Sequence, residues 1–340
     1  MALEFGIFDS IDLGRSAPGA VMHGRLEIAA HAEAIGFDRY HVTEHHGTAL
    51  SVIPPSLFLA ALSQRTSRMR IGTLVYVVPD HEPLRLAEDV ATLDQLTRGR
   101  FDFGVGRGVS PFELEYFGVA AAESDAILRR SLAAILESYR TGAFTHPTEA
   151  RPVANLPTLP VQTPHPPLWY ASGTPATAAR VGAEGHNLVA RWEGGALPAI
   201  ASEFWDAWRA AHGGEPEPRM GAAAGVYVGE SDAGAMDRYL TAGHVYWERL
   251  TSLWHEHGVT GADHLYEPQD MLDKQNALVG SAATVRDRLA AMLESAEINY
   301  FELTTTFGDL SVEEAKASIS RLGGVLDDLR GVAAGARMVG

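Results

Sequence analysis

The chain has 340 residues, a formal net charge of −16 and no cysteine. Such an acidic chain would be repelled by nucleic acid and by an anionic membrane surface, so neither is an expected partner. The absence of cysteine excludes disulfides, thiolate nucleophiles and cysteine-ligated zinc. The N-terminal segment has no basic start, and no apolar run approaches the roughly 20 residues of a membrane span. We therefore expect a soluble cytoplasmic protein.

Short apolar strands alternate with longer amphipathic helices along the chain. The expected strands are residues 3–8, 39–44, 70–78, 101–105, 168–171, 187–192, 222–228 and 300–307. Repeated strand–helix units imply parallel strands joined by right-handed crossovers. Eight such units predict a closed (β/α)8 barrel, the TIM-barrel fold, as a single domain over residues 1–340.

Two stretches interrupt this alternation. Residues 141–166 are rich in proline and lack periodicity, which predicts an irregular surface insertion. Residues 258–279 are polar and aperiodic. A loop of that length is often a lid or a binding loop, although a surface insertion without function is the alternative.

An open, doubly wound sheet is the alternative architecture. Such sheets usually carry a glycine-rich phosphate loop after the first strand. Here the residues at 9–12, DSID, follow that strand without glycine. The run GVGRG at 104–108 matches only the first two glycines of G-x-G-x-x-G, because Val109 occupies the third position. The closed barrel is therefore favoured.

The segment RYHVTEHH at 39–46 places ionisable side chains where an expected strand ends. Barrel active sites lie at the carboxyl ends of the strands, so Glu44 and His45 are candidate site residues. Neighbouring side chains on a strand point to opposite faces, so His45 and His46 reach one site only if the strand has ended. No standard metal-ligand spacing occurs, and no metal is expected. One neutral imidazole could act as donor or base; alternatively, an imidazole bonds a loop and Glu44 pairs with an arginine.

Glycines alternate at the end of the fourth expected strand. Gly104, Gly106 and Gly108 lie on one face, which suggests close approach of a flat ligand or of another backbone. Arg107 lies between them, and its planar guanidinium suits a phosphate. Its alternative partner is a nearby carboxylate such as Glu113 or Glu115.

A third cluster follows the fifth expected strand. Thr174 is a candidate helix N-cap, Pro175 suits the first helical position, and Ser172 and Gly173 precede them. A helix N-terminus that includes Thr177 offers free N–H groups to an anion. An ordinary cap without ligand is the alternative. The fourth and fifth strands of a barrel are neighbours. This helix start and Arg107, at the end of the fourth expected strand, could therefore hold one phosphate.

Trp192 ends the sixth expected strand. A tryptophan at a barrel mouth can stack on a flat ring. The alternative is that it packs beneath a loop.

Taken together, these positions resemble the bacterial luciferase-like family of flavin-dependent monooxygenases. The resemblance is carried by FGIFDS at 5–10, EHH at 44–46, IGTLVYVVP at 71–79, AEDVATLDQLTRGRFDFGVGRG at 87–108 and PHPPLWYASGTPATAARVGAEG at 164–185. It runs in the same order over nearly the whole chain. It implies a (β/α)8 barrel that is usually dimeric.

The resemblance also implies roles for individual residues. His45 matches the family's histidine near the reactive edge of the flavin, and Arg107 matches the arginine on the cofactor phosphate. Leu74–Val75 matches a place where the family often has a non-proline cis peptide under the flavin ring. Trp192 matches an aromatic residue beside the ring.

The same resemblance places Ser172, Gly173 and Thr177 in the family's phosphate loop. Two departures stand out. Luciferase α chains carry cysteine where this chain has Gly106, which should leave more room over the ring and puts light emission in doubt. Luciferases can carry glutamate in place of Ser172, so the phosphate contacts should differ.

The function implied is oxidation of a small organic substrate by reduced FMN and O2 through a peroxyflavin, with the flavin supplied by a separate reductase. An aldehyde, a ketone or an aromatic secondary metabolite would suit. A dehydrogenase dependent on the deazaflavin F420 shares this barrel and is the nearest alternative. A flavin-binding protein without turnover is a third reading.

Overall fold

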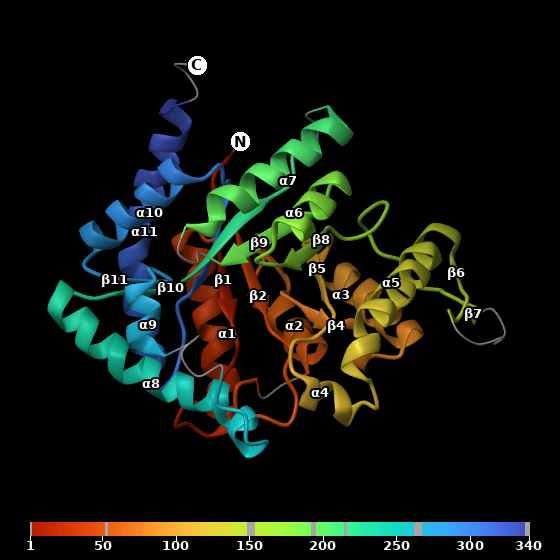
Figure 1. The fold of residues 1–340 in the computed structure, drawn as a ribbon, viewed down its shortest axis with the longest axis horizontal. Coiled ribbons are helices and arrows are strands. Elements are labelled where there is room, and N and C mark those ends of the chain that lie inside the picture. The colour runs from red at the N-terminus through yellow and green to blue at the C-terminus, as the bar shows by residue number, and fades with distance from the viewer. Residues whose placement is uncertain are drawn as a thin grey trace.

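Parallel strands close into a barrel at the centre of the molecule (Figure 1). The computed structural model describes residues 2–51, 54–147, 154–191, 195–213, 216–261 and 267–336. The ring consists of β1 Glu4–Asp9, β2 Arg39–Val42, β3 Arg70–Thr73, β5 Phe101–Gly106, β8 Leu168–Ala171, β9 Asn187–Arg191, β10 Met220–Val228 and β12 Tyr300–Thr304. Each strand pairs in parallel with the next, and β12 pairs with β1. The predicted (β/α)8 fold is confirmed.

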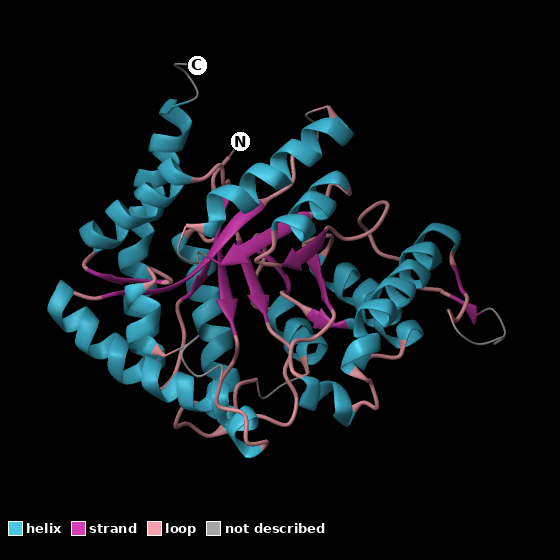
Figure 2. Ribbon diagram, viewed as in Figure 1, coloured by secondary structure: helices cyan, strands magenta, loops and turns pink. Residues whose placement is uncertain are grey.

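Helices surround the strands (Figure 2). The longer ones are α1 Pro18–Ile35, α2 Pro55–Ser63, α3 Pro83–Thr97, α5 Ser124–Thr141, α6 Pro175–Ala183, α7 Ala196–His212, α8 Asp232–Glu256, α10 Ala282–Ser295 and α11 Val312–Ala336. Several start with proline, which is tolerated there because the first helical N–H has no intrahelical partner. Among the described helices, none combines the length and apolarity needed to cross a bilayer.

Short elements fill the connections between these units. They are β4 Tyr76–Val77, η1 Val78–Asp80, α4 Pro111–Tyr116, η2 Ala121–Glu123, β6 Ala143–Phe144, β7 Ala154–Asn155, α9 Pro268–Asp273 and β11 Ala277–Gly280. Within the stretch 141–166, β6 and β7 form an antiparallel pair that lies beyond α5 in Figure 1.

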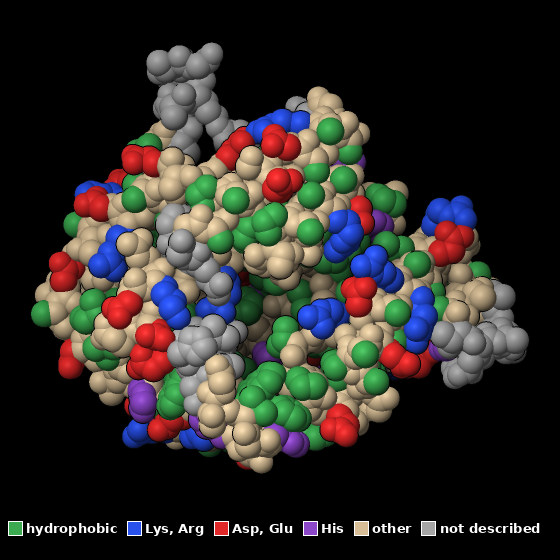
Figure 3. All heavy atoms as spheres, viewed as in Figure 1, with side chains coloured by type: hydrophobic (Ala, Val, Ile, Leu, Met, Phe, Trp, Pro, Cys, Tyr) green, Lys and Arg blue, Asp and Glu red, His purple; other side chains and the backbone are tan. Residues whose placement is uncertain are grey.

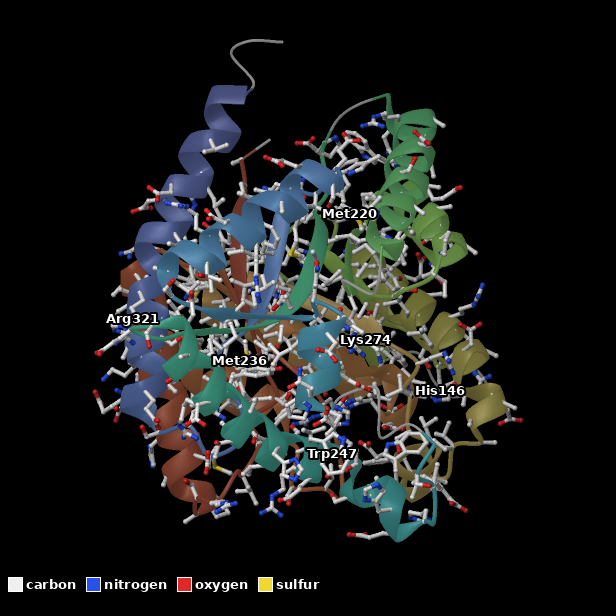
Figure 4. All side chains as sticks on the ribbon, turned by 60° about the vertical axis from the view of Figure 1, so that its left-hand side comes forward. His146, Met220, Met236, Trp247, Lys274 and Arg321 are labelled. Atoms are coloured by element: carbon white, nitrogen blue, oxygen red, sulfur yellow. The ribbon has the colours of Figure 1, made fainter. Side chains whose placement is uncertain are left out.

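The second stretch, 258–279, is more regular than its composition predicts. It contains α9 and most of β11, which pairs with the end of β10. Figure 4 shows α9, which ends beside Lys274, next to the long α8 that carries Trp247. Residues 262–266, like residues 148–153 of the other stretch, lie outside the described part of the chain.

The barrel interior is polar beneath the mouth. Asp102 on β5 accepts hydrogen bonds from Arg39 Nε at 3.1 Å and from Arg70 Nε at 2.8 Å. His41 on β2 lies between Asp102 and Glu302 of β12, at 3.3 and 3.0 Å. Burial alone would raise the pKa of Asp102, but the two guanidinium groups and His41 hold it well below its usual range. Apolar side chains on the outward faces, such as Phe101 and Leu303, pack under the helices.

Candidate functional site

A cavity of about 700 Å³ opens at the carboxyl ends of the strands. This volume lies within the range of roughly 300–1,000 Å³ that is typical of small-molecule sites. The face of the molecule in Figure 3 is hollowed near its centre, and apolar side chains gather below the hollow. Residues from β1, β2, β3, β5, β8, β9, β10 and β12 or from the turns after them line the cavity.

The strand that leads to the EHH motif ends earlier than predicted. β2 stops at Val42, so residues 43–46 lie outside the strand and do not follow its alternation. His45 borders the cavity. His46 instead packs edge-on against Phe117, with ring centroids 4.7 Å apart, and lies 3.4 Å from Glu44 Oε1. Only the first of the two histidines therefore lines the cavity wall.

His45 is oriented by a carboxylate from a distant part of the chain. Its Nδ1 lies 3.1 Å from Glu113 Oε1 on α4. The other oxygen of Glu113 accepts the backbone N–H of His46 at 2.8 Å, and Glu113 N–H is capped by Ser110. The carboxylate thus selects the tautomer with the proton on Nδ1, leaving Nε2 of His45 as the acceptor. Within the described residues, Nε2 has no hydrogen-bond partner.

Glu44 is buried, and its carboxylate is hydrogen-bonded to β4 and to the segment that follows β4. It accepts the Val77 N–H at 2.6 Å and lies 2.9 Å from His81 Nε2. Burial alone would raise its pKa, but the hydrogen bonds from His46, His81 and Val77 lower the pKa of Glu44 to about 2. Its partners are therefore imidazoles and a backbone amide, in place of the arginine considered above. It stays ionised and fixes the chain just past residues 74–75.

The Leu74–Val75 peptide bond is cis, as the resemblance implies. Both residues border the cavity. The glycines of β5 leave room for this segment: a Cβ on Gly104 would lie 1.9 Å from the Thr73 carbonyl oxygen, and one on Gly106 would lie 2.4 Å from Val75 Cγ2. Backbone approach therefore accounts for Gly104, whereas Gly106 accommodates the Val75 side chain. Gly106 also borders the cavity, so the expectation that it leaves room over a ring stays a prediction.

The side chains suited to a phosphate border one part of the cavity. Arg107 is exposed at the end of β5, and Ser172, Gly173, Thr174 and Thr177 follow the adjacent strand β8. Glu113 interacts with His45 instead. Within the described ranges, no acidic side chain forms an ion pair with Arg107. The guanidinium is therefore available to an anionic ligand.

The start of α6 has the predicted cap. Thr174 Oγ1 accepts the Thr177 N–H at 3.4 Å, and Pro175 occupies the first turn. A Cβ placed on Gly173 would have no atom within 4 Å, so the loop leaves open space before the helix. Trp192, predicted to lie beside a ring, falls outside the described residues.

The opposite part of the cavity contains groups that the sequence reasoning missed. Glu302 and Asn276 border it together with Ala223, Tyr239 and Phe307. Asp80 also lines the wall, and burial together with Glu44 raises the pKa of Asp80 to about 7. Asp80 lies within three residues of a strand end, as Glu44 does, which could have marked it. Asn276 lies in a stretch interpreted as a loop, and Glu302 lies inside a strand.

A family model described as luciferase-like monooxygenase matches residues 3–299. The chain therefore belongs to this family of barrel oxidoreductases. It is 32% identical over 324 residues to an uncharacterized protein, y4wF, of Sinorhizobium fredii, with 92% of each chain covered. It is also 33% identical over 161 residues to the alkanal monooxygenase alpha chain of Aliivibrio fischeri, covering 46% of this chain and 45% of that one.

Solved structures share the fold. The oxygenating constituent of 3,6-diketocamphane monooxygenase from Pseudomonas putida, in complex with FMN, superimposes with a TM-score of 0.78. The two chains are 19% identical, and the match covers 95% of this chain and 97% of that one. At this identity the likeness establishes the barrel alone.

Proposed function

We propose that this protein is the oxygenase component of a flavin-dependent monooxygenase, using reduced FMN from a separate reductase and O2 to oxidise a small organic substrate. The observation that carries the proposal is that Arg107, which has no ion-pair partner in the described part of the chain, and the α6 N-terminus border one cavity. The family match supports it. We also expect a cytoplasmic homodimer, on family resemblance.

The residues present fit FMN. Arg107 would hold its phosphate by charge-assisted hydrogen bonds, assisted by Ser172, Thr177 and the free N–H groups of α6. The Leu74–Val75 segment would support the ring, because it forms the cavity wall between β3 and β5. Reduced FMN would supply the two electrons that activate O2.

The chain's own groups then have separable roles. His45 Nε2, with its tautomer fixed by Glu113, would accept or return a proton at the reacting oxygen. Glu44 would act as a positioning residue for residues 74–77 rather than as an acid, since it remains ionised. The apolar walls exclude water from the reduced cofactor.

Rapid mixing tests the proposed function. Protein titrated anaerobically with reduced FMN is mixed with oxygenated buffer, and the flavin spectrum is recorded. We expect tight binding and reoxidation much slower than that of free reduced FMN. Binding with reoxidation as fast as that of free flavin would contradict the oxygenase, and tight binding of F420 without FMN binding would favour the dehydrogenase alternative.

His45→Asn separates an enzyme from a flavin-binding protein without turnover. The variant should keep its affinity for reduced FMN, because it leaves Arg107 and the α6 N-terminus unchanged. Its reoxidation of reduced FMN by O2 should become as fast as that of free flavin. An unchanged reoxidation time course in the variant would count against a catalytic role for this histidine.

A further inference from the structure

Four buried side-chain oxygens that border the cavity have no hydrogen-bond partner among the described residues: Thr43 Oγ1, Asp80 Oδ1, Asn276 Oδ1 and Glu302 Oε1. Two of them, Glu302 Oε1 and Asn276 Oδ1, belong to the part of the cavity formed by β10, β11 and β12. Glu302 is fully buried and Asn276 is 2% exposed. A buried acceptor without a donor loses the hydrogen bonds that water would provide, at a substantial free-energy cost. A donor on a ligand in the cavity would remove that cost.

The surroundings of Glu302 fix it as an acceptor. Its Oε2 lies 2.5 Å from the Tyr300 hydroxyl, which donates to it, and 3.0 Å from His41 Nδ1. The other nitrogen of His41 faces Asp102 at 3.3 Å, so both imidazole nitrogens face carboxylates and the ring is held as a cation that donates to each. With two donors on Oε2, Oε1 is left to accept from the cavity.

These acceptors lie far from the phosphate-suited groups. Around the ring the order is β1-β2-β3-β5-β8-β9-β10-β12, so β12 is diametrically opposite β5. Glu302 is in register with Ala223 of β10, and Ala277, next to Asn276, is in register with Gly225. The small side chains of β10 leave the space between the acceptors open, and Tyr239, Phe307 and Met271 supply apolar walls.

We propose that the end of the cavity formed by β10, β11 and β12 is the substrate subsite, and that Glu302 and Asn276 select a compact ring compound carrying hydroxyl or N–H donors. This inference rests on the proposed function, because it assumes that the cofactor occupies the β3, β5 and β8 side. A donor-free aliphatic aldehyde would leave both acceptors unpaired and is disfavoured.

Matched probes test this preference on FMN-saturated protein by calorimetric titration. 2-Naphthol carries a hydroxyl donor, 2-methoxynaphthalene lacks it, and decanal represents donor-free aldehydes. We expect 2-naphthol to bind about 10- to 100-fold more tightly than its ether, as expected for a hydrogen bond to a charged acceptor. Equal affinities would mean that water alone satisfies the acceptors and would overturn the inference.

Variants test whether Glu302 and Asn276 cause the preference for 2-naphthol over its methyl ether. Glu302→Gln removes the charge at constant shape and should reduce the 2-naphthol preference at least several-fold. Asn276→Leu should lower it as well, and it keeps the test valid if the first variant does not fold, as judged by circular dichroism. Glu313→Gln, on a side chain that is 81% exposed, is the matched control and should change nothing.

FMN affinity separates failure of the inference from failure of the proposed function. If wild-type protein does not bind FMN, the proposed function fails. If FMN binds normally but Glu302→Gln weakens FMN and leaves the probe preference intact, Glu302 contacts the cofactor and the substrate subsite is wrong.

Discussion

At the residue scale, the three ionisable groups of the EHH motif have different environments despite being adjacent. His45 borders the cavity with its Nδ1 on Glu113, His46 packs against Phe117, and Glu44 is buried on His81. The difference arises because β2 ends at Val42, so residues 43–46 do not follow the alternation of the strand. Sequence spacing alone cannot reveal this separation.

Arg107→Ala should weaken FMN binding about 10- to 100-fold, because the variant loses charge-assisted hydrogen bonds to the phosphate. Fluorescence titration measures the affinity, and Arg129→Ala, an exposed arginine paired along α5 with Asp125, is the control. Riboflavin lacks the phosphate and should bind the wild type and the variant equally. An Arg107→Ala protein with wild-type FMN affinity would refute the assigned phosphate site.

The raised pKa of His41 predicts that the folded protein loses stability in mild alkali. Burial would lower this pKa, but Glu302 and Asp102 raise the pKa of His41 to about 9, from 6.5. Its contribution is therefore complete below about pH 6.5 and is lost as the pH rises to about 9, by up to about 3 kcal/mol. Urea unfolding across this range measures the loss. Nitrogen NMR should show a His41 imidazolium at pH 7.5; a neutral ring there would contradict the assigned charge.

At the element scale, the glycines of β5 are required by the adjacent segment, residues 73–75. These glycines accommodate the backbone and side chains of residues 73–75 where the cis peptide lies. The sequence left open whether a ligand or a backbone required them, since both need a missing Cβ. The α6 start could be predicted more fully, because an N-cap threonine followed by proline is a local signal.

Gly104→Ala should destabilise the protein by about 1–3 kcal/mol, since the new Cβ would lie 1.9 Å from a backbone oxygen that cannot move freely. Gly19→Ala, in α1 with no atom within 4 Å of its Cβ, is the control and should leave stability unchanged or slightly raised. Chemical denaturation measures both. Equal stability of the two variants would show that β5 and residues 73–75 are not in close contact.

At the scale of the whole molecule, alternation of strands and helices was enough to predict the closed barrel, because eight parallel strands in a ring leave no edge unpaired. The predicted strands all occur, with ends that differ by a few residues. Residues paired over long sequence separations could not be predicted. Glu113 meets His45 from α4, and Glu302 meets His41 across the barrel, through contacts that no local pattern encodes.

Binding linkage gives a prediction for the whole fold. A ligand that binds only the folded state stabilises it by about 2.7 kcal/mol at 100 times its dissociation constant. FMN at that excess should therefore raise the midpoint of thermal unfolding, and riboflavin at the same concentration should raise it less because it lacks the phosphate. Equal shifts for the two would contradict phosphate recognition by Arg107 and α6.

The most direct test of the central claim is anaerobic equilibrium titration of the protein with reduced FMN and, separately, with reduced F420. We predict that reduced FMN binds at least about tenfold more tightly, and that Arg107→Ala removes most of this affinity. Tighter binding of F420, or no binding of reduced FMN, would contradict the assignment of this cavity to a reduced-FMN oxygenase.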